Sequence, residues 1–365
     1  MRVRRIVSAA MRPFETFVVG SLPRPRWVQE VVEDRREGRL DPEAAAELLD
    51  AAVPLAVRLQ ERAGLDVVSD GEWRRESYVK VFSENVDGFA AGESQTRLAG
   101  APPDMVVVAP LEPRRPIAAR EVTFLRTIRD GPVVVALPSP YILAWRTWSA
   151  QRSRAAYATR EEFMEACIPI LRAELRVLVE TGVDHVQIDE PWLLMLVDPA
   201  ERERRGVTNI DREIETCVNA VNAMVDGVAG VTTSMHLCHG HFNRQRATDG
   251  GYEPIIEALA EIRVDRFAME FAAPHSHGVD VLSRFPADKT LGLGVIDHCD
   301  PHVETPEEVV ARAEAALEHM PPERLTLNPD CGFAPGSLNP MNLDEAYEKL
   351  QAMCRGAMLL RERYL

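Results

Sequence analysis

The chain has 365 residues, of which 46% are hydrophobic and 27% charged, a composition typical of folded globular proteins rather than of disordered chains. Its formal net charge of −15 repels nucleic acids and anionic membranes, and no apolar run approaches the roughly 18 residues that a membrane span needs. We therefore expect a soluble protein that binds small molecules, with no nucleic-acid or membrane partner. Its oligomeric state stays open.

The six cysteines are scattered along the chain, without the dense spacing of a secreted disulfide framework. This distribution favours a reducing cytoplasm, where cysteines more often serve a metal or a reaction. The basic start MRVRRIVSAAM has too short an apolar part for a secretory signal. We expect residues 1–15 to be a flexible leader and residues 16–365 to form one catalytic domain.

Short runs rich in Val, Ile, Leu and Phe alternate with helix-like segments along the chain. Eight such runs are predicted strands, at residues 17–21, 65–70, 132–138, 183–189, 231–238, 266–272, 290–297 and 325–331. This alternation of nearly continuous apolar strands with helices predicts a parallel sheet covered on both faces, and eight units close into a single (β/α)8 TIM barrel. An open doubly wound sheet is the alternative, but GSLPRP at 20–25 lacks its usual glycine-rich phosphate loop.

The segments between the strands carry recognisable helix signals. Residues 41–63 open with Asp41 as an N-cap, and residues 305–319 open with Thr305, Pro306 and two acids. The last predicted helix covers about 342–361. The segment 84–131 is long and weakly periodic, so we expect an insertion after the second strand that folds over the barrel mouth.

Polar side chains gather where the predicted strands end, which is where barrel enzymes build their sites. His236 and Cys238 lie two apart in one strand, so both side chains can point at the same ion. Glu270 ends the next strand and Cys331 the last. One His, two Cys and one Glu form a borderline-soft donor set that suits Zn²⁺.

This donor set also indicates the kind of chemistry. Two thiolates and a carboxylate leave the ion little Lewis acidity for activating water, so hydrolysis is disfavoured. A substrate thiol, in contrast, could bind the ion and lose its proton at neutral pH. We therefore expect sulfur to be the nucleophile.

The motifs MHLCHGHFN (235–243), NPDCG (328–332) and VQIDEP (186–191) resemble the catalytic half of cobalamin-independent methionine synthases. Weaker similarities are VVGSLPRP (18–25), the Gly-Glu pair at 71–72, PSPYILAW (138–145) and GVIDHCDP (294–301). The likeness runs from about Val19 to the C-terminus. It implies a zinc-dependent methyltransferase of the uroporphyrinogen decarboxylase and methionine synthase-like barrel superfamily, in a core-only form that lacks the long amino-terminal barrel.

The resemblance also implies roles for individual residues. Its zinc ligands fall on His236, Cys238, Glu270 and Cys331, and the groups that hold homocysteine fall on Val19, Ser21, Glu72 and Asp189. Carboxylates suit an α-ammonium group, and Ser21 with nearby backbone amides suits an α-carboxylate. The tryptophan near the pterin falls on Trp145, whose other interpretation is an aromatic anchor at the barrel rim.

Two departures from the family pattern bear on the methyl donor. The family's proton-donating histidine falls on Cys299, so we assign that role to the neighbouring His298, preceded by Asp297. A glutamate associated with folate appears here as Met195. The donor is accordingly left open between methyltetrahydrofolate and a methyl-corrinoid protein, and the expected acceptor is a thiol such as homocysteine.

Other residues allow further interpretations. His239, His241, His275 and His277 lie near the expected metal ligands in sequence, where histidines orient a ligand, form a second metal site or are solvated loop residues; we favour the first interpretation for His239 or His241. Arg114 and Arg115 are either a contact for an anionic donor or plain surface. The alternative functions are a zinc-dependent thiol transferase that attacks an epoxide or another electrophile, as coenzyme M transferases do, and a structural zinc site, which would be closed.

Overall fold

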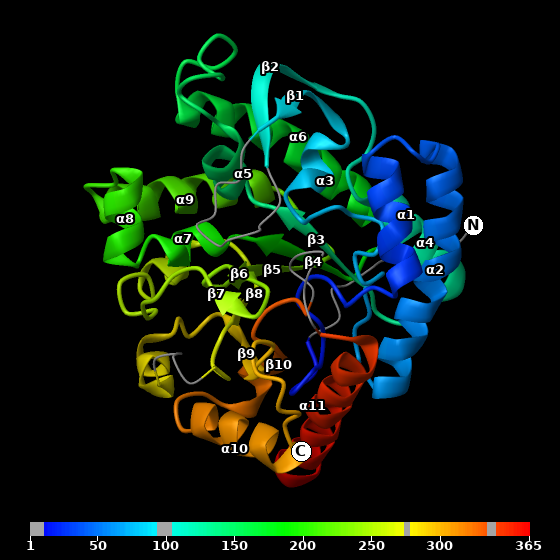
Figure 1. Ribbon diagram of the computed structural model, residues 1–365. Helices are drawn as coiled ribbons and strands as arrows, with labels where there is room; N and C mark the ends of the chain where they lie inside the picture. The colour runs from blue at the N-terminus through cyan, green and yellow to red at the C-terminus, as the bar shows by residue number, and fades with distance from the viewer. Residues whose placement is uncertain (1–10, 93–103, 274–277, 334–340) are drawn as a thin grey trace.

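Six parallel strands form the continuous part of the central sheet in the computed structural model, which describes residues 11–92, 104–273, 278–333 and 341–365 (Figure 1). Along the sheet they follow one another in chain order: β3 (Val134–Pro138), β4 (His185–Asp189), β5 (Thr232–Leu237), β8 (Arg266–Met269), β9 (Thr290–Ile296) and β10 (Leu325–Pro329). Nearly all of their residues are buried, as expected of strands covered on both faces.

Two further segments close this sheet into a ring. Thr16 pairs in parallel with Leu327 of β10, and Val68 pairs in parallel with Val133 before β3. Val67 N donates to Thr16 O at 3.1 Å, which joins the two segments to each other. The predicted (β/α)8 barrel is thus confirmed, although its first two strands form only isolated bridges. The first pairing lies at residues 14–17 rather than 17–21.

The barrel includes residues that precede residue 16. Residues 1–10 lie outside the described part of the chain, but Phe14 and Glu15 are buried. Phe14 N donates to Leu325 O at 2.7 Å. Residues 14 and 15, which the sequence analysis placed in the leader, are therefore part of the barrel wall.

Helices surround the ring and pack their apolar faces against it (Figure 1). The α-helices are α1 (Arg26–Arg36), α2 (Pro42–Ala63), α3 (Lys80–Ser83), α4 (Ala119–Ile128), α5 (Pro140–Thr147), α6 (Arg160–Glu180), α7 (Pro191–Met195), α8 (Pro199–Arg205), α9 (Ile210–Val225), α10 (Pro306–Leu317) and α11 (Leu343–Tyr364), and the 3₁₀ helices are η1 (Ala258–Glu261), η2 (Val279–Arg284) and η3 (Pro322–Arg324). None of these helices in the described residues is both long and apolar enough to cross a membrane.

The predicted helix signals act as caps. Asp41 Oδ1 accepts hydrogen bonds from two backbone N–H groups at the start of α2. Thr305 and Glu308 form a complete capping box at the start of α10. These side chains satisfy N–H groups that have no partner within their own helix, so both helices begin within a residue of their predicted starts.

The insertion predicted at 84–131 contains an antiparallel hairpin and one helix of the barrel layer. Strands β1 (Val86–Ala91) and β2 (Met105–Pro113) form the hairpin, and α4 follows it. Asp104, just before β2, is buried and accepts hydrogen bonds from Arg146 of α5 at 2.9 and 2.6 Å. The insertion therefore reaches the barrel mouth through Asp104.

A small apolar cluster fills the inside of the ring, formed by Phe17, Val19, Val67, Val134 and Ala268. Its members come from opposite sides of the ring, so they can meet only across its interior. Near the amino ends of the strands, Arg266 lies over the Phe17 ring and 3.2 Å from Glu15, while His185 lies 3.8 Å from Glu15. The barrel is a packed core, which leaves the carboxyl ends of its strands for a site.

Candidate metal centre and substrate site

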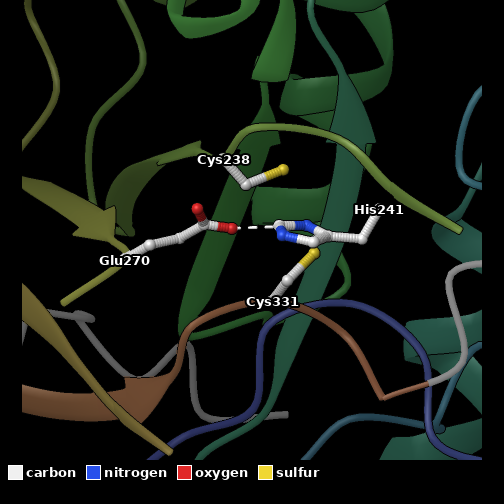
Figure 2. Close-up of side chains that lie close together, drawn as sticks. All are labelled: Cys238, His241, Glu270 and Cys331. Carbon is white, nitrogen blue, oxygen red and sulfur yellow. Dashed lines mark ion pairs between the residues drawn. The ribbon is translucent and has the colours of Figure 1, made fainter. Parts of the chain in front are cut away.

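Four potential metal ligands converge at the carboxyl ends of the strands. Cys238 directly follows β5, Glu270 directly follows β8, and Cys331 lies two residues after β10. One donor atom from each of them and one ring nitrogen of His241 all lie within 4.8 Å of one another. Figure 2 shows these side chains pointing into a common space. The sequence thus identified three members of this group.

His236, the expected nitrogen ligand, lies beside the group rather than in it. It is part of β5, is buried, and neither ring nitrogen has a hydrogen-bond partner among the described residues. Burial disfavours its charged form, but Cys238 and the carboxylates of Asp189 and Glu270 outweigh burial and raise the pKa of His236 to about 9. Its imidazole therefore faces the same anionic centre as that of His241.

The two cysteines of the group interact directly. A hydrogen bond from Cys331 holds the pKa of the Cys238 thiol well below its usual range, and the adjacent His236 and His241 act in the same direction. The same hydrogen bond, together with burial, raises the pKa of Cys331. Cys238 is therefore the thiolate of the pair, and thiolates are the form of cysteine that binds metals.

Residues around Glu270 fix its position. His239 contacts Glu270 Oε2 through Nδ1 and the Gly250 carbonyl through Nε2, and Glu270 N donates to Tyr252 Oη at 2.7 Å. The contact of His239 with the Glu270 carboxylate is the kind that orients a metal ligand.

Asp330 is a site residue that the sequence analysis missed. Its carboxylate accepts hydrogen bonds from the backbone N–H groups of Phe271, Ala272 and Ala273, directly after Glu270. It therefore ties the loop that carries Glu270 to the loop that carries Cys331. Burial, and next the charge of Glu270, raise the pKa of Asp330 to about 7. A carboxylate immediately before Cys331 was the signal that could have revealed it.

A cavity opens beside the metal group, and most of the expected substrate residues line it. Its walls include Ser21, Glu72, Asp189, His236, Cys238, His241 and Cys331. Burial, reinforced by the charge of Glu72, raises the pKa of Asp189 to about 7. Burial also raises the pKa of Glu72, against the opposing effect of Arg75. Two carboxylates that burial penalises in this way are a favourable environment for a cation.

Comparison with known proteins identifies the family of this chain. The family described as "Cobalamin-independent synthase, Catalytic domain" matches residues 14–358. The chain belongs to the cobalamin-independent methionine synthase family. The methionine synthase of Saccharolobus solfataricus is 30% identical over 350 residues, which cover 95% of each chain. That of Thermococcus kodakarensis is 30% identical over 95% of this chain and 93% of its own length.

Solved structures support the fold of this family member. A B12-independent methionine synthase from Shewanella sp. W3-18-1, solved in complex with selenomethionine, superposes with a TM-score of 0.79. The match covers 96% of this chain and 98% of the other at 23% identity, so it is a likeness of fold alone.

Val19 and Ser21, which the family resemblance assigns to the substrate site, lie at the first turn of the barrel and differ in their surroundings. Val19 lies in the interior cluster, whereas Ser21 lines the cavity. Ser21 O accepts a hydrogen bond from Phe333 N at 2.9 Å. Gly332 lies so close that an added Cβ would be 2.9 Å from both Val19 O and Ser21 N. The first turn and the Cys331 turn are thus in direct backbone contact.

Trp145 lies behind the cavity wall. The cavity is lined instead by Trp192, which stacks on Trp145 with ring centroids 6.0 Å apart. The Arg160 guanidinium carbon lies 3.7 Å from the Trp145 ring centroid. Trp192 directly follows the IDEP motif at a strand end, which is the signal that could have identified it as one of the aromatic residues that line the cavity.

Asp297 and His298 directly follow β9, next to His241. The rings of His298 and His241 meet edge to face with centroids 4.3 Å apart. Burial holds the pKa of His298 well below its usual range, and His298 Nε2 lies 3.4 Å from Cys299 Sγ. The Asp297 carboxylate accepts the Cys299 N–H at 2.8 Å, so it shapes this turn.

The remaining candidates divide by position. Met195 lines the cavity, where it presents an apolar side chain instead of the family's glutamate. Arg114 and Arg115 hydrogen-bond to Glu84 and Asn85 at the base of the insertion hairpin. His275 and His277 lie outside the described residues.

Proposed function

We propose that this protein transfers a methyl group to the zinc-activated thiol of homocysteine, giving methionine. The observation that carries the proposal is the group of Cys238, His241, Glu270 and Cys331 at one end of a cavity that Glu72 and Asp189 also line. A thiol-bearing amino acid has a sulfur for the first group and an ammonium for the second. The printed names of the relatives, methionine synthase, agree with this assignment.

The donor set fits zinc. Two sulfurs, a carboxylate and an imidazole match the ligands and the coordination number that zinc prefers, and Cys238 already favours its thiolate form. We expect Cys238, Glu270 and Cys331 to hold the ion together with an imidazole, which the family resemblance assigns to His236. A zinc ion there would lower the pKa of a bound thiol and so supply a thiolate at neutral pH.

The chain's own residues orient the acceptor. Glu72 and Asp189 accept hydrogen bonds from the ammonium group, while Ser21 and the backbone of its turn bind the α-carboxylate. Trp192 and Met195 form an apolar wall against which a methyl donor can lie with water excluded. We assign the transfer of a proton to the leaving group to His298, which is in ring contact with His241; because its pKa is lowered, it holds this proton only transiently.

The test offers the zinc-loaded protein homocysteine with methyltetrahydrofolate or with a methyl-corrinoid protein, in parallel, and measures methionine. We expect one donor to support turnover and Cys238→Ser to abolish it. Cys217→Ala, on α9 outside the site, is the control for loss of a thiol. Methionine formation by metal-free Cys238→Ser protein would refute the proposal, and consumption of the thiol by an epoxide alone would favour the thiol transferase.

A further inference from the structure

The hairpin after β5 carries a second imidazole to the metal group. Strand β6 (His241–Phe242) pairs with β7 (Gln245–Arg246), and the two residues between them, Asn243 and Arg244, have φ values of 52° and 59°. Positive φ at both central positions is the geometry of a type I′ turn, whose twist matches that of a hairpin. The direction of the His241 side chain is therefore set by this hairpin and not by β5.

The hairpin is fixed at both ends. Arg244 donates hydrogen bonds to both carboxylate oxygens of Glu345 in α11, at 2.8 and 2.7 Å. At its base, Ala247 N donates to Gly240 O at 2.7 Å. The turn type and these two contacts together fix the position of His241.

The His241 ring faces Glu270 without a hydrogen bond. His241 Nδ1 lies 3.3 Å from Glu270 Oε1, both side chains are 2% exposed, and neither atom has a hydrogen-bond partner among the described residues. Buried polar atoms are normally hydrogen-bonded, so this pair requires an explanation. A cation bound by both atoms, with Cys238 and Cys331 within 4.8 Å, would provide one.

We propose that His241 is itself a ligand of the metal ion, so that the centre has five protein donors and two of them are imidazoles. This inference deepens the proposed function and rests on it only in that a metal occupies the centre. Zinc usually takes four ligands, and catalytic zinc sites leave one position to a substrate. With a fifth donor in reach, four protein ligands would still be available to the ion if a substrate thiol replaced one of them. The place of a His241 ring nitrogen within 4.8 Å of donor atoms of Cys238, Glu270 and Cys331 makes His241 a functional residue beyond the set that the resemblance implied.

The test measures coordination directly, without thiol or methyl donor. Zinc-edge X-ray absorption of the full-length protein counts imidazole and sulfur neighbours, and competition with a chromophoric chelator gives the zinc dissociation constant. We expect His241→Ala to lose an imidazole signal and to bind zinc at least tenfold more weakly. His302→Ala, which removes an exposed histidine paired with Glu308, is the matched control and should change neither quantity.

His241→Cys guards against a trivial loss of folding. If residue 241 reaches the ion, this variant should show three sulfur neighbours instead of two, and its cobalt(II) form should gain thiolate-to-metal absorption. Unchanged coordination and zinc affinity in both His241 variants would overturn the inference. Zinc bound through His241 in a protein that forms no methionine would overturn the proposed function instead, so the two failures are distinguishable.

Discussion

Residues behind the proposed metal ligands decide how well these ligands are placed. Asp330 accepts three backbone N–H groups behind Glu270 and directly precedes Cys331. Groups that orient metal ligands are worth about 10- to 100-fold in metal affinity. They should therefore be visible in binding measurements before they are visible in folding.

Asp330→Ala is expected to weaken zinc binding by about tenfold or more, because the loops that carry Glu270 and Cys331 lose their common anchor. Chelator competition measures the affinity and thermal unfolding of the metal-free protein measures stability. The zinc affinity of Asp330→Asn, which keeps one acceptor oxygen, should lie between those of Asp330→Ala and the unmodified protein. An affinity equal to that of the unmodified protein would show that Asp330 has no positioning role.

His185 should make the barrel less stable in acid. Burial and the charge of Arg266 lower its pKa to about 3, far below the ordinary value of 6.5. Between these values the unfolded chain binds a proton that the folded chain does not, so the free energy of unfolding falls as pH drops below about 6.5. In His185→Gln this part of the pH dependence should disappear, which urea unfolding at pH 7 and pH 5 will show as a smaller difference between the two midpoints. An identical difference in both proteins would contradict the assignment.

At the scale of elements, the site depends on contacts between loops that are distant in sequence. The turn at Val19 and Ser21 approaches Gly332 so closely that no Cβ fits between them. Gly332→Ala should therefore push the two turns apart and lower the free energy of unfolding by about 1–3 kcal/mol. It should also raise the KM for the thiol, because Ser21 moves. Gly278→Ala, where an added Cβ meets nothing within 4 Å, is the control. Equal stability of both variants would show that the contact is not tight.

Much of this level was predictable from the sequence, because hydrophobic runs and caps are local signals. Six predicted strands correspond to β3, β4, β5, β8, β9 and β10, and Asp41 and Thr305 cap helices as expected. The first two strands were predicted too long, because apolar character cannot tell a long ladder from an isolated bridge. Cys238, Glu270 and Cys331 were found through their places at strand ends.

The sequence could not predict the place of His241. Its approach to the metal group depends on positive φ at Asn243 and Arg244 and on a contact with Glu345 about a hundred residues away. Trp192 was missed in favour of Trp145 because their stacking order relative to the cavity is a property of packing between α5 and α7. The direction in which a loop side chain points is set by contacts between segments that are distant in sequence, so local sequence patterns do not reveal it.

At the scale of the whole molecule, a metal ion at the proposed centre would join separate parts of the barrel. Cys238, Glu270 and Cys331 follow β5, β8 and β10, so one ion bound by all three would bridge these strands, and binding to the folded state alone would stabilise that state. Removing the metal with a chelator should therefore lower Tm by about 3–4 °C, given about 2.7 kcal/mol at a hundredfold excess over Kd and roughly 1.3 °C for each kcal/mol in a chain of 365 residues. Calorimetry before and after zinc is restored measures this. If Tm stays the same after loss of the metal has been verified, metal binding does not stabilise the folded state, and the site is not preorganised by the fold.

The barrel wall is hydrogen-bonded unevenly: six strands form continuous ladders, and two segments join them by isolated bridges. Cys238, Glu270 and Cys331 follow strands of the arc of six hydrogen-bonded strands, whereas Ser21 and Glu72 follow the two segments that join the ring by single bridges. Regions with few main-chain hydrogen bonds open at lower free energy than continuous ladders. Three of the proposed ligands are consequently held by the stiffer part of the barrel, whereas Ser21 and Glu72 lie on the side that opens more easily, so these two substrate contacts can adjust while the coordination geometry is preserved.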